Sequence, residues 1–140
     1  YPVFIEAESS RIGELFIPNN IWKRMSLSPL VMINVPLDAR SEYLVSSYKN
    51  LIFLTKNLKG LIKGMKSRYG NDRITCWQNL LNDKNWLGLA KNLLEFHYDP
   101  AYERSMKRHD REILKEIIQL NCSSKCIIDS VNQIKNLKIL

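Results

Sequence analysis

Short apolar runs bounded by turn residues predict two buried strands in the first part of the chain. Residues 2–5 and 31–35 are nearly continuous apolar runs, and runs of this length are typical of strands in parallel sheets. Residues 15–17 predict a brief extended stretch. The sequence Pro18-Asn19-Asn20 then predicts the start of a short helix at about residues 21–27.

A helical pattern follows from residue 44 to residue 69, with Asp38 as the expected N-cap of its first helix. We expect a break near residues 53–56, where Thr55 can cap a second helix, and a stop at Gly70. The apolar positions recur at steps of three and four and so share one face: Leu44, Tyr48, Leu51, Leu54, Leu58, Leu61, Met65 and Tyr69.

Helical patterns resume at about residues 75–81 and 86–96. Pro100 predicts an interruption at residues 97–100, because the residue before a proline is pushed away from the α conformation. Residues 116–120 predict a last strand, and Ser123 or Ser124 can cap a terminal helix that runs to about residue 137.

This order of elements predicts an α/β fold with a partial parallel sheet, a large helical insertion at about residues 44–109, and a final strand and helix at about 114–137. The sheet is too small to stand alone, and the chain opens without Met inside an apolar run. We therefore expect residues 1–140 to be the C-terminal part of one larger domain.

Composition excludes several classes of protein. The 140 residues are 45% hydrophobic and 25% charged, which is typical of a globular domain rather than of a disordered chain or a coiled coil. No apolar run approaches the roughly 20 residues that cross a bilayer, so we expect no membrane association. Three cysteines favour a reducing, cytoplasmic location over a disulfide framework.

The net charge of +7 is concentrated in residues 49–73, where seven basic residues against Asp72 alone supply +6. On a helix the lysines would fall within an arc of about 100° beside the apolar stripe. Such a ridge suits a polyanion such as RNA, or it is a solvated face. The candidate contacts are Lys56, Lys59, Lys63 and Lys66.

An acidic and basic segment follows the first predicted strand. Glu6 and Glu8 are two residues apart, so their carboxylates point the same way if the chain stays extended. They could then hold a hydrated Mg²⁺ beside a phosphate that Arg11 contacts. The alternative is a solvated strand end with a local ion pair.

A second dense segment runs from His97 to Ser105 and contains groups that donate, accept or stack. It predicts either a site at the end of a helix or a packed turn whose polar side chains cap neighbouring helices. Its candidate substrate contacts are His97, Tyr98, Asp99, Tyr102 and Arg104.

Together these segments resemble the C-terminal region of tRNA 2-selenouridine synthase. The resemblance rests on Glu6-Ala7-Glu8-Ser9-Ser10-Arg11-Ile12-Gly13, on Pro18 with Trp22 to Met25, and on His97-Tyr98-Asp99-Pro100-Ala101-Tyr102-Glu103-Arg104-Ser105. It covers nearly the whole chain and is weakest after residue 123.

The resemblance implies a P-loop-like module joined to a rhodanese-like module that bears the catalytic cysteine. It implies a transferase that replaces sulfur by selenium at the wobble 2-thiouridine of tRNA, with selenophosphate as donor and a geranylated intermediate made from geranyl diphosphate. A nucleotide with Mg²⁺ and an enzyme that supplies selenophosphate are further expected partners. Residues 2–6 would then correspond to the Walker B strand, and Ser9 and Arg40 join the candidate phosphate contacts.

The chain also departs from that family. It has no phosphate-binding G-x-x-x-x-G-K-[ST] segment, and Cys76, Cys122 and Cys126 do not match the catalytic cysteine or the spacing of a metal site. We therefore expect this polypeptide alone to be inactive, with no catalytic residue and no metal ligand assigned in it. The alternative is a non-catalytic basic α/β module that binds RNA or a protein partner.

Overall fold

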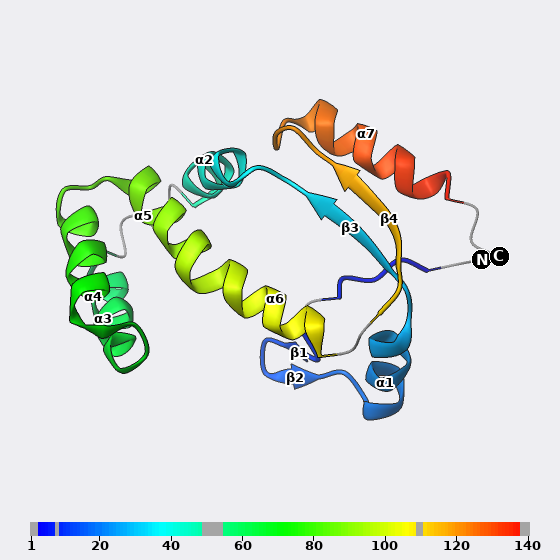
Figure 1. Ribbon diagram of the computed structural model, residues 1–140, viewed down its shortest axis with the longest axis horizontal. Helices are drawn as coiled ribbons and strands as arrows, with labels where there is room; N and C mark the ends of the chain where they lie inside the picture. Colours follow the sequence, from blue (N-terminus) through cyan, green and yellow to red (C-terminus); the bar gives the residue numbers. More distant parts are fainter. Residues whose placement is uncertain (1–2, 8, 49–54, 109–110, 138–140) are drawn as a thin grey trace. The chain divides into compact units, whose positions relative to one another are not determined.

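A computed structural model describes residues 3–7, 9–48, 55–108 and 111–137. The fold is α/β, mostly helical, with a small parallel sheet (Figure 1). The chain divides into two compact units. We call Tyr1–Val35 with Asp99–Leu140 the sheet unit, and Pro36–Tyr98 the helical unit.

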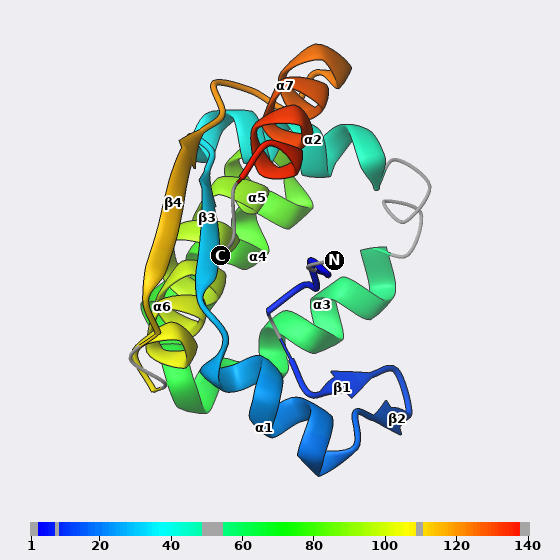
Figure 2. The same cartoon turned by 90° about the vertical axis from the view of Figure 1, so that its right-hand side faces the viewer.

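The sheet unit is built on a parallel pair of strands, β3 (Leu30–Asn34) and β4 (Ile113–Ile118), which lie side by side in Figures 1 and 2. The strand expected near residues 31–35 is thus confirmed, although only Leu30 in it is fully buried. The short helix α1 (Asn19–Leu27) precedes β3, as predicted, and helix α7 (Ser124–Lys135) follows β4. Ser123 caps α7, since its hydroxyl accepts a hydrogen bond from the Cys126 amide at 3.4 Å.

The strand expected at residues 2–5 is wrong for the part that the structure describes. Residues 3–7 have no regular secondary structure, and Val3, Phe4 and Ile5 are exposed. A strand needs a hydrogen-bonded neighbour, and the described residues supply none to this segment. A small antiparallel hairpin follows instead, formed by β1 (Arg11–Ile12) and β2 (Leu15–Phe16).

The helical unit begins with α2 (Leu37–Ser47), whose N-cap is Pro36. Asp38 lies inside the first turn, so its predicted role as N-cap is wrong. Its carboxylate instead pairs with Lys91 at 2.6 Å. An acidic side chain in the first turn still interacts favourably with the helix dipole.

Two helices, α3 (Thr55–Gly64) and α4 (Lys66–Asn82), pack against each other. The sequence predicted one helix across this boundary, which is wrong because the chain turns at Met65. The predicted stop at Gly70 is confirmed, since its backbone angles (φ 75°, ψ 175°) are non-helical and α4 consists of two helical pieces that meet at a kink there. A glycine adopts this positive φ without the steric penalty that a side chain brings. The expected break at residues 53–56 lies partly outside the described residues.

Helix α5 (Trp86–Leu93) continues into a π-helical turn, η2 (Leu94–Tyr98), and α6 (Asp99–Lys107) follows directly. The interruption expected at residues 97–100 is therefore wrong. Pro100 is the second residue of α6 and directly follows the π-helical turn, so the helical run continues through it although it has no N–H group to donate.

One apolar cluster forms the core of the helical unit. Trp77, Ile62, Leu81, Leu89 and Ile74 are each 5% exposed or less, and half-buried residues such as Met65 and Tyr69 pack around them. Ile62 occupies the buried position that the pattern assigned to Leu61, which is 64% exposed. Within the described segments, no helix combines the length and apolar character needed to cross a membrane.

Candidate nucleic-acid interface

The acidic and basic segment near the start of the chain is exposed. Glu6 and Ser9 are on the surface of an irregular stretch, and Glu8 lies outside the described residues. The Ser9 hydroxyl accepts a hydrogen bond from the Arg11 amide at 3.0 Å, which fixes the entry to the β1–β2 hairpin. Arg40 is half-buried on α2, in the other unit.

Arg11 is engaged by its own hairpin. Its Nε donates to the Gly13 carbonyl at 2.8 Å, and its guanidinium lies 5.6 Å from the centre of the Phe16 ring. These contacts hold the side chain on the hairpin surface. Among the described residues, no group of three or more His, Cys, Asp or Glu side chains could hold a metal ion.

The structure divides the His97 segment between the two units. His97 and Tyr98 end the helical unit, whereas Asp99, Tyr102 and Arg104 belong to α6 in the sheet unit. Tyr102 and Arg104 are exposed on α6, and Asp99 is half-buried in its first turn.

In the helical unit, an aromatic network surrounds His97. The Tyr69 hydroxyl is 2.6 Å from His97 Nδ1, and the two rings meet edge-on at 5.5 Å. The Tyr69 ring also lies 5.1 Å from that of the buried Trp77. Tyr98 packs edge-on against His97, with ring centres 4.9 Å apart, but remains 58% exposed, so part of its side chain is accessible to a ligand.

Two arginines extend this network on α4. The Arg73 guanidinium lies 3.5 Å from the centre of the Phe96 ring, and Arg68 lies 5.4 Å from the centre of the Tyr69 ring. A guanidinium over an aromatic face is attracted by the ring quadrupole. Both contacts bring positive charge to the neighbourhood of η2.

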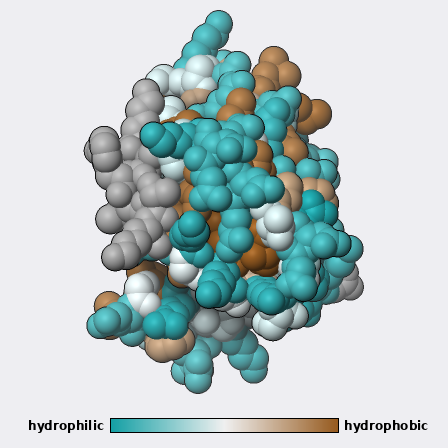
Figure 3. Space-filling view, turned by 90° about the vertical axis from the view of Figure 1, so that its left-hand side faces the viewer, coloured by the Kyte–Doolittle hydropathy of each residue, from teal (hydrophilic) through white to brown (hydrophobic). Residues whose placement is uncertain are grey.

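The predicted lysine ridge does not lie on one helix. Lys59 and Lys63 are exposed one turn apart on α3, but α3 ends at Gly64 and Lys66 is the first residue of α4. The side chain of Lys56 lies outside the described ones. Hydrophilic residues dominate the view in Figure 3, taken from the side on which α3 and α4 lie in Figure 1.

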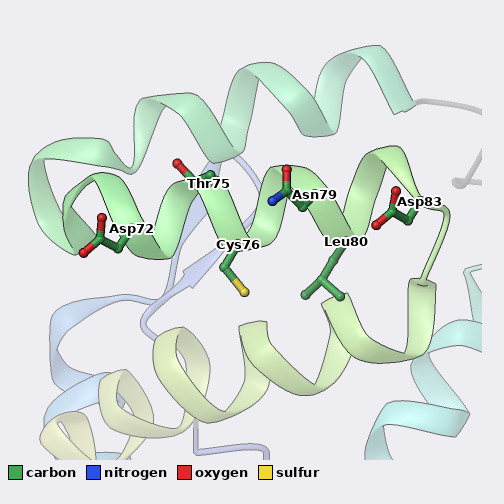
Figure 4. A pocket seen from close by; sticks show the side chains of 6 residues that line it. All are labelled: Asp72, Thr75, Cys76, Asn79, Leu80 and Asp83. Carbon is green, nitrogen blue, oxygen red and sulfur yellow. The ribbon is translucent and has the colours of Figure 1, made fainter.

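Along α4 runs an open hollow in two connected parts. One part, about 330 Å³, is lined by Tyr69, Asp72, Arg73 and Cys76. The other, about 500 Å³, shares Asp72 and Cys76 and continues past Leu80 to Asp83. In Figure 4, Cys76 and Leu80 point from α4 toward α5, while Asp72 and Asp83 lie near opposite ends of the hollow.

Comparison with known proteins identifies the family. A family model described as the tRNA 2-selenouridine synthase AAA domain matches residues 1–127. The chain belongs to this family. The resemblance carried by the Glu6 and His97 segments is thereby confirmed.

Relatives named tRNA 2-selenouridine synthase occur in several bacteria. The chain is 26% identical over 136 residues to the protein of Chromohalobacter salexigens, a match that covers 79% of this chain and 37% of the relative. It is 24% identical over 137 residues to that of Psychromonas ingrahamii, covering 76% and 37%. The chain thus spans little more than a third of the length of these relatives. No solved structure matches it significantly.

Sequence reasoning did not single out Tyr69, Arg73 and Phe96 as members of a site. The sequence pattern places Tyr69 in an apolar stripe and gives Arg73 only as part of the basic segment. No local signal in the sequence connects them, because the contacts of Tyr69 with His97 and of Arg73 with Phe96 form only when α4 and η2 pack together.

Proposed function

We propose that this chain is part of a transferase that replaces sulfur by selenium at the wobble 2-thiouridine of tRNA. Its membership of the tRNA 2-selenouridine synthase family over residues 1–127 carries the proposal. Selenophosphate is the proposed selenium donor. Geranyl diphosphate first alkylates the sulfur with loss of diphosphate. The selenium of selenophosphate then attacks C2 of the base and displaces geranyl thiol, and water cleaves the Se–P bond to release phosphate.

Within such an enzyme we assign this chain to the P-loop-like module. The parallel β3–β4 pair and the helices that follow each strand support that assignment, since parallel strands alternate with helices in α/β folds. The reactive cysteine is proposed to come from the rhodanese-like module. A cytoplasmic location and an enzyme that supplies selenophosphate belong to the same proposal.

The proposal is tested by transfer of selenium to tRNA. Full-length protein is incubated with thiolated tRNA, geranyl diphosphate and selenophosphate, and the modified nucleosides are quantified by mass spectrometry. We expect 2-selenouridine to appear only when all three are present. Binding of tRNA without any conversion would favour the alternative, a non-catalytic basic module, which the exposed Lys59 and Lys63 also suit.

The exposed lysines of α3 are the proposed contacts for tRNA phosphates. Each neutralised phosphate releases counterions, so each lost contact makes the dependence of log affinity on log salt shallower by about one. Lys59→Ala with Lys63→Ala should therefore reduce the slope by about two. The matched control is Lys23→Ala with Lys125→Ala, two exposed lysines of the sheet unit; an equal change in both pairs would contradict the assignment.

The His97 segment is the proposed contact for an unpaired base, with Tyr98 or Tyr102 stacking and Arg104 meeting a phosphate. Loss of one stacked base costs about 1–3 kcal/mol in RNA binding. Tyr98→Ala should weaken tRNA binding by at least fivefold with little change in melting temperature. A large fall in melting temperature at unchanged affinity would show that Tyr98 serves packing alone.

The acidic segment is the proposed site of a phosphate group and its Mg²⁺, with Glu6, Glu8, Ser9, Arg11 and Arg40 as candidates. Removal of one charge-stabilising contact in a closed site costs about 2–4 kcal/mol of barrier. Glu6→Gln and Glu8→Gln should then lower the rate of selenium transfer much more than the stability. If both variants transfer selenium at the parental rate, the acidic segment is a solvated segment and not a binding site.

A further inference from the structure

Two interruptions of regular helical geometry meet at one hydrogen bond in the helical unit. Gly70 forms the kink of α4, and Tyr69 is the residue directly before it. His97 lies in the π-helical turn η2. The Tyr69 hydroxyl and His97 Nδ1 are 2.6 Å apart, although the two residues are 28 positions apart in the sequence. Since π-helical turns and unusual backbone angles are frequent at functional sites, this pair is a candidate for a functional role.

The hydroxyl of Tyr69 is the donor in this hydrogen bond. In a neutral imidazole one ring nitrogen carries the proton and the other accepts. A phenol O–H is more acidic than the N–H of a neutral imidazole, so it forms the stronger bond when it donates to the unprotonated nitrogen. The 2.6 Å separation agrees, since it is shorter than the range of about 2.7–3.2 Å for N–H donors and falls within that of O–H donors. Nδ1 of His97 is therefore the acceptor, and Nε2 carries the proton.

Aromatic neighbours keep both rings in place. The Tyr69 ring lies 5.1 Å from that of Trp77, which is 0% exposed. The His97 ring meets the Tyr69 ring edge-on at 5.5 Å and the Tyr98 ring edge-on at 4.9 Å, and His97 remains only half-buried. Because the hydrogen bond at one imidazole nitrogen decides which nitrogen carries the proton, Tyr69 sets the tautomer of His97 as well as its orientation.

We propose that Tyr69 is a positioning residue for selenium transfer. It holds His97 as a neutral imidazole with its proton on Nε2, and His97 presents this N–H group as a donor to an oxygen of the RNA substrate. Tyr69 acts only through His97. This inference rests on the proposed function, because it takes His97 as one of the substrate contacts of the transferase.

The tautomer is tested in the full-length protein by nitrogen NMR with labelled histidine, at about pH 8, where an ordinary imidazole is neutral. The signals of His97 are those that disappear in His97→Gln. We expect an unprotonated Nδ1 and a protonated Nε2 in the parent. Tyr69→Phe keeps the ring and its packing but removes the donor, so a measurable share of the Nδ1-protonated form should appear. A proton on Nδ1 in the parent, or an unchanged tautomer in Tyr69→Phe, would overturn the inference.

The effect on the reaction is measured as kcat/KM for selenium transfer to tRNA. Tyr69→Phe should lower kcat/KM about two- to tenfold, the effect of one hydrogen bond between neutral groups. In the His97→Gln background the same change should cause no further loss, because Tyr69 acts only through His97. The matched control is Tyr43→Phe, the same substitution at a tyrosine on α2 that is 48% exposed, and it should leave kcat/KM unchanged.

A role of Tyr69 in packing alone predicts a different result. Tyr69→Phe would then lower the melting temperature, and its effect on kcat/KM would be the same with His97 as with glutamine at that position. Such additive losses would contradict the inference, and so would a parental kcat/KM in Tyr69→Phe. All variants are assayed at a temperature at which circular dichroism shows them folded, so a lower melting temperature does not decide the outcome.

Failure of this inference is separable from failure of the proposed function. If the parent protein forms 2-selenouridine and Tyr69→Phe does so with parental kcat/KM, only the role of Tyr69 falls. If the parent forms no 2-selenouridine, the proposed function falls, and the role of Tyr69 in selenium transfer falls with it, whichever tautomer His97 adopts.

Discussion

In the helical unit, Trp77 and Leu81 are almost wholly buried, whereas in the sheet unit Ile118 and Leu120 keep about three quarters of their surface exposed, at 75% and 73%. The two units also differ in the kind of residue that they bury. Besides Leu30 and Ile117, the described residues buried in the sheet unit are polar, namely Ser26, Gln119 and Ser130. The helical unit therefore contains a core of its own, and the sheet unit shows a sheet that its described neighbours cover only in part.

This difference indicates which unit contributes most to the stability of the fold. Buried apolar area is the main favourable term in folding, so the helical unit should contribute most of the free energy of unfolding. Parallel sheets are nearly always covered on both faces. The β3–β4 pair departs from this pattern among the described residues, and it is held instead by strand pairing and by a few polar contacts.

The largest effect is expected at the centre of the helical core. Trp77→Ala should lower the free energy of unfolding by about 3–5 kcal/mol, because it leaves a large cavity. Urea unfolding followed by circular dichroism measures the change. Leu61→Ala, at an exposed site on α3, is the control and should cost less than about 0.5 kcal/mol; similar losses in both variants would break the contrast between buried and exposed positions.

A smaller loss is expected in the sheet unit. Ile117→Ala removes a side chain that is 1% exposed, and we expect a loss of about 2 kcal/mol, at the low end for such substitutions, since the partly covered surroundings can close around the space. Ile118→Ala, the next residue, should change stability by less than about 0.5 kcal/mol. A loss at Ile117 equal to that at Trp77 would mean that the sheet unit is as well packed as the helical unit.

The buried polar contact of the sheet unit should contribute less to the free energy of unfolding than the side chain of Ile117. Ser130 on α7 donates a hydrogen bond to the Gln119 side chain at 2.9 Å, in buried surroundings. Ser130→Ala leaves that amide oxygen with one partner fewer, at a cost of about 1–2 kcal/mol. A double-mutant cycle with Gln119→Ala measures the coupling, and additive losses would exclude an interaction between the two side chains.

The smallest effect is expected for the ion pair between α2 and α5 in the helical unit. The side chains of Lys91 and Asp38 are 36% and 71% exposed. Solvent and salt screen such pairs, so their coupling should be no more than about 0.5 kcal/mol and should fall further in 1 M salt. A cycle of Asp38→Ala and Lys91→Ala tests this, and a coupling above about 1 kcal/mol would contradict the assignment of stability to apolar burial.

Local signals in the sequence predicted the sheet unit's regular elements well. The apolar run of β3 and the serine before α7 each specify an element within a few residues, and the prolines on both sides of β3 mark its ends. The predicted first strand failed because strand formation depends on a neighbour elsewhere in the structure. An apolar run indicates a tendency to form a strand, but it does not identify the neighbouring strand with which that strand must pair.

Local signals were less reliable where helices meet. Gly70 and Pro100 each act through the backbone, and the sequence predicts an end at both. The prediction is confirmed at Gly70, where non-helical angles separate two helical pieces of α4, although the second piece begins directly after it. Pro100 follows a π-helical turn and lies in a first helical turn, so its ring meets less conflict than it would inside an α-helix.

The candidate site was predictable in composition but not in arrangement. The sequence indicated a basic segment and a His97 segment, and the structure brings Tyr69 from the first to His97 in the second. The two residues are 28 positions apart, and the chain between them includes two turns whose geometry no local pattern specifies. The pattern likewise did not specify that Ile62, rather than Leu61, faces the core.

The π-helical turn has a consequence for how the chain tolerates changes in length. Such a turn accommodates one residue more than an α-helical turn would. Removing Glu95, an exposed member of η2, would let the segment return to α-helical spacing. A deletion inside α5 would turn every residue after it by about 100°, whereas a deletion in η2 is largely compensated because the wide turn becomes an α-helical one. The ring of His97 would thus stay nearer to Tyr69 after loss of one surface residue in η2 than after loss of one in α5.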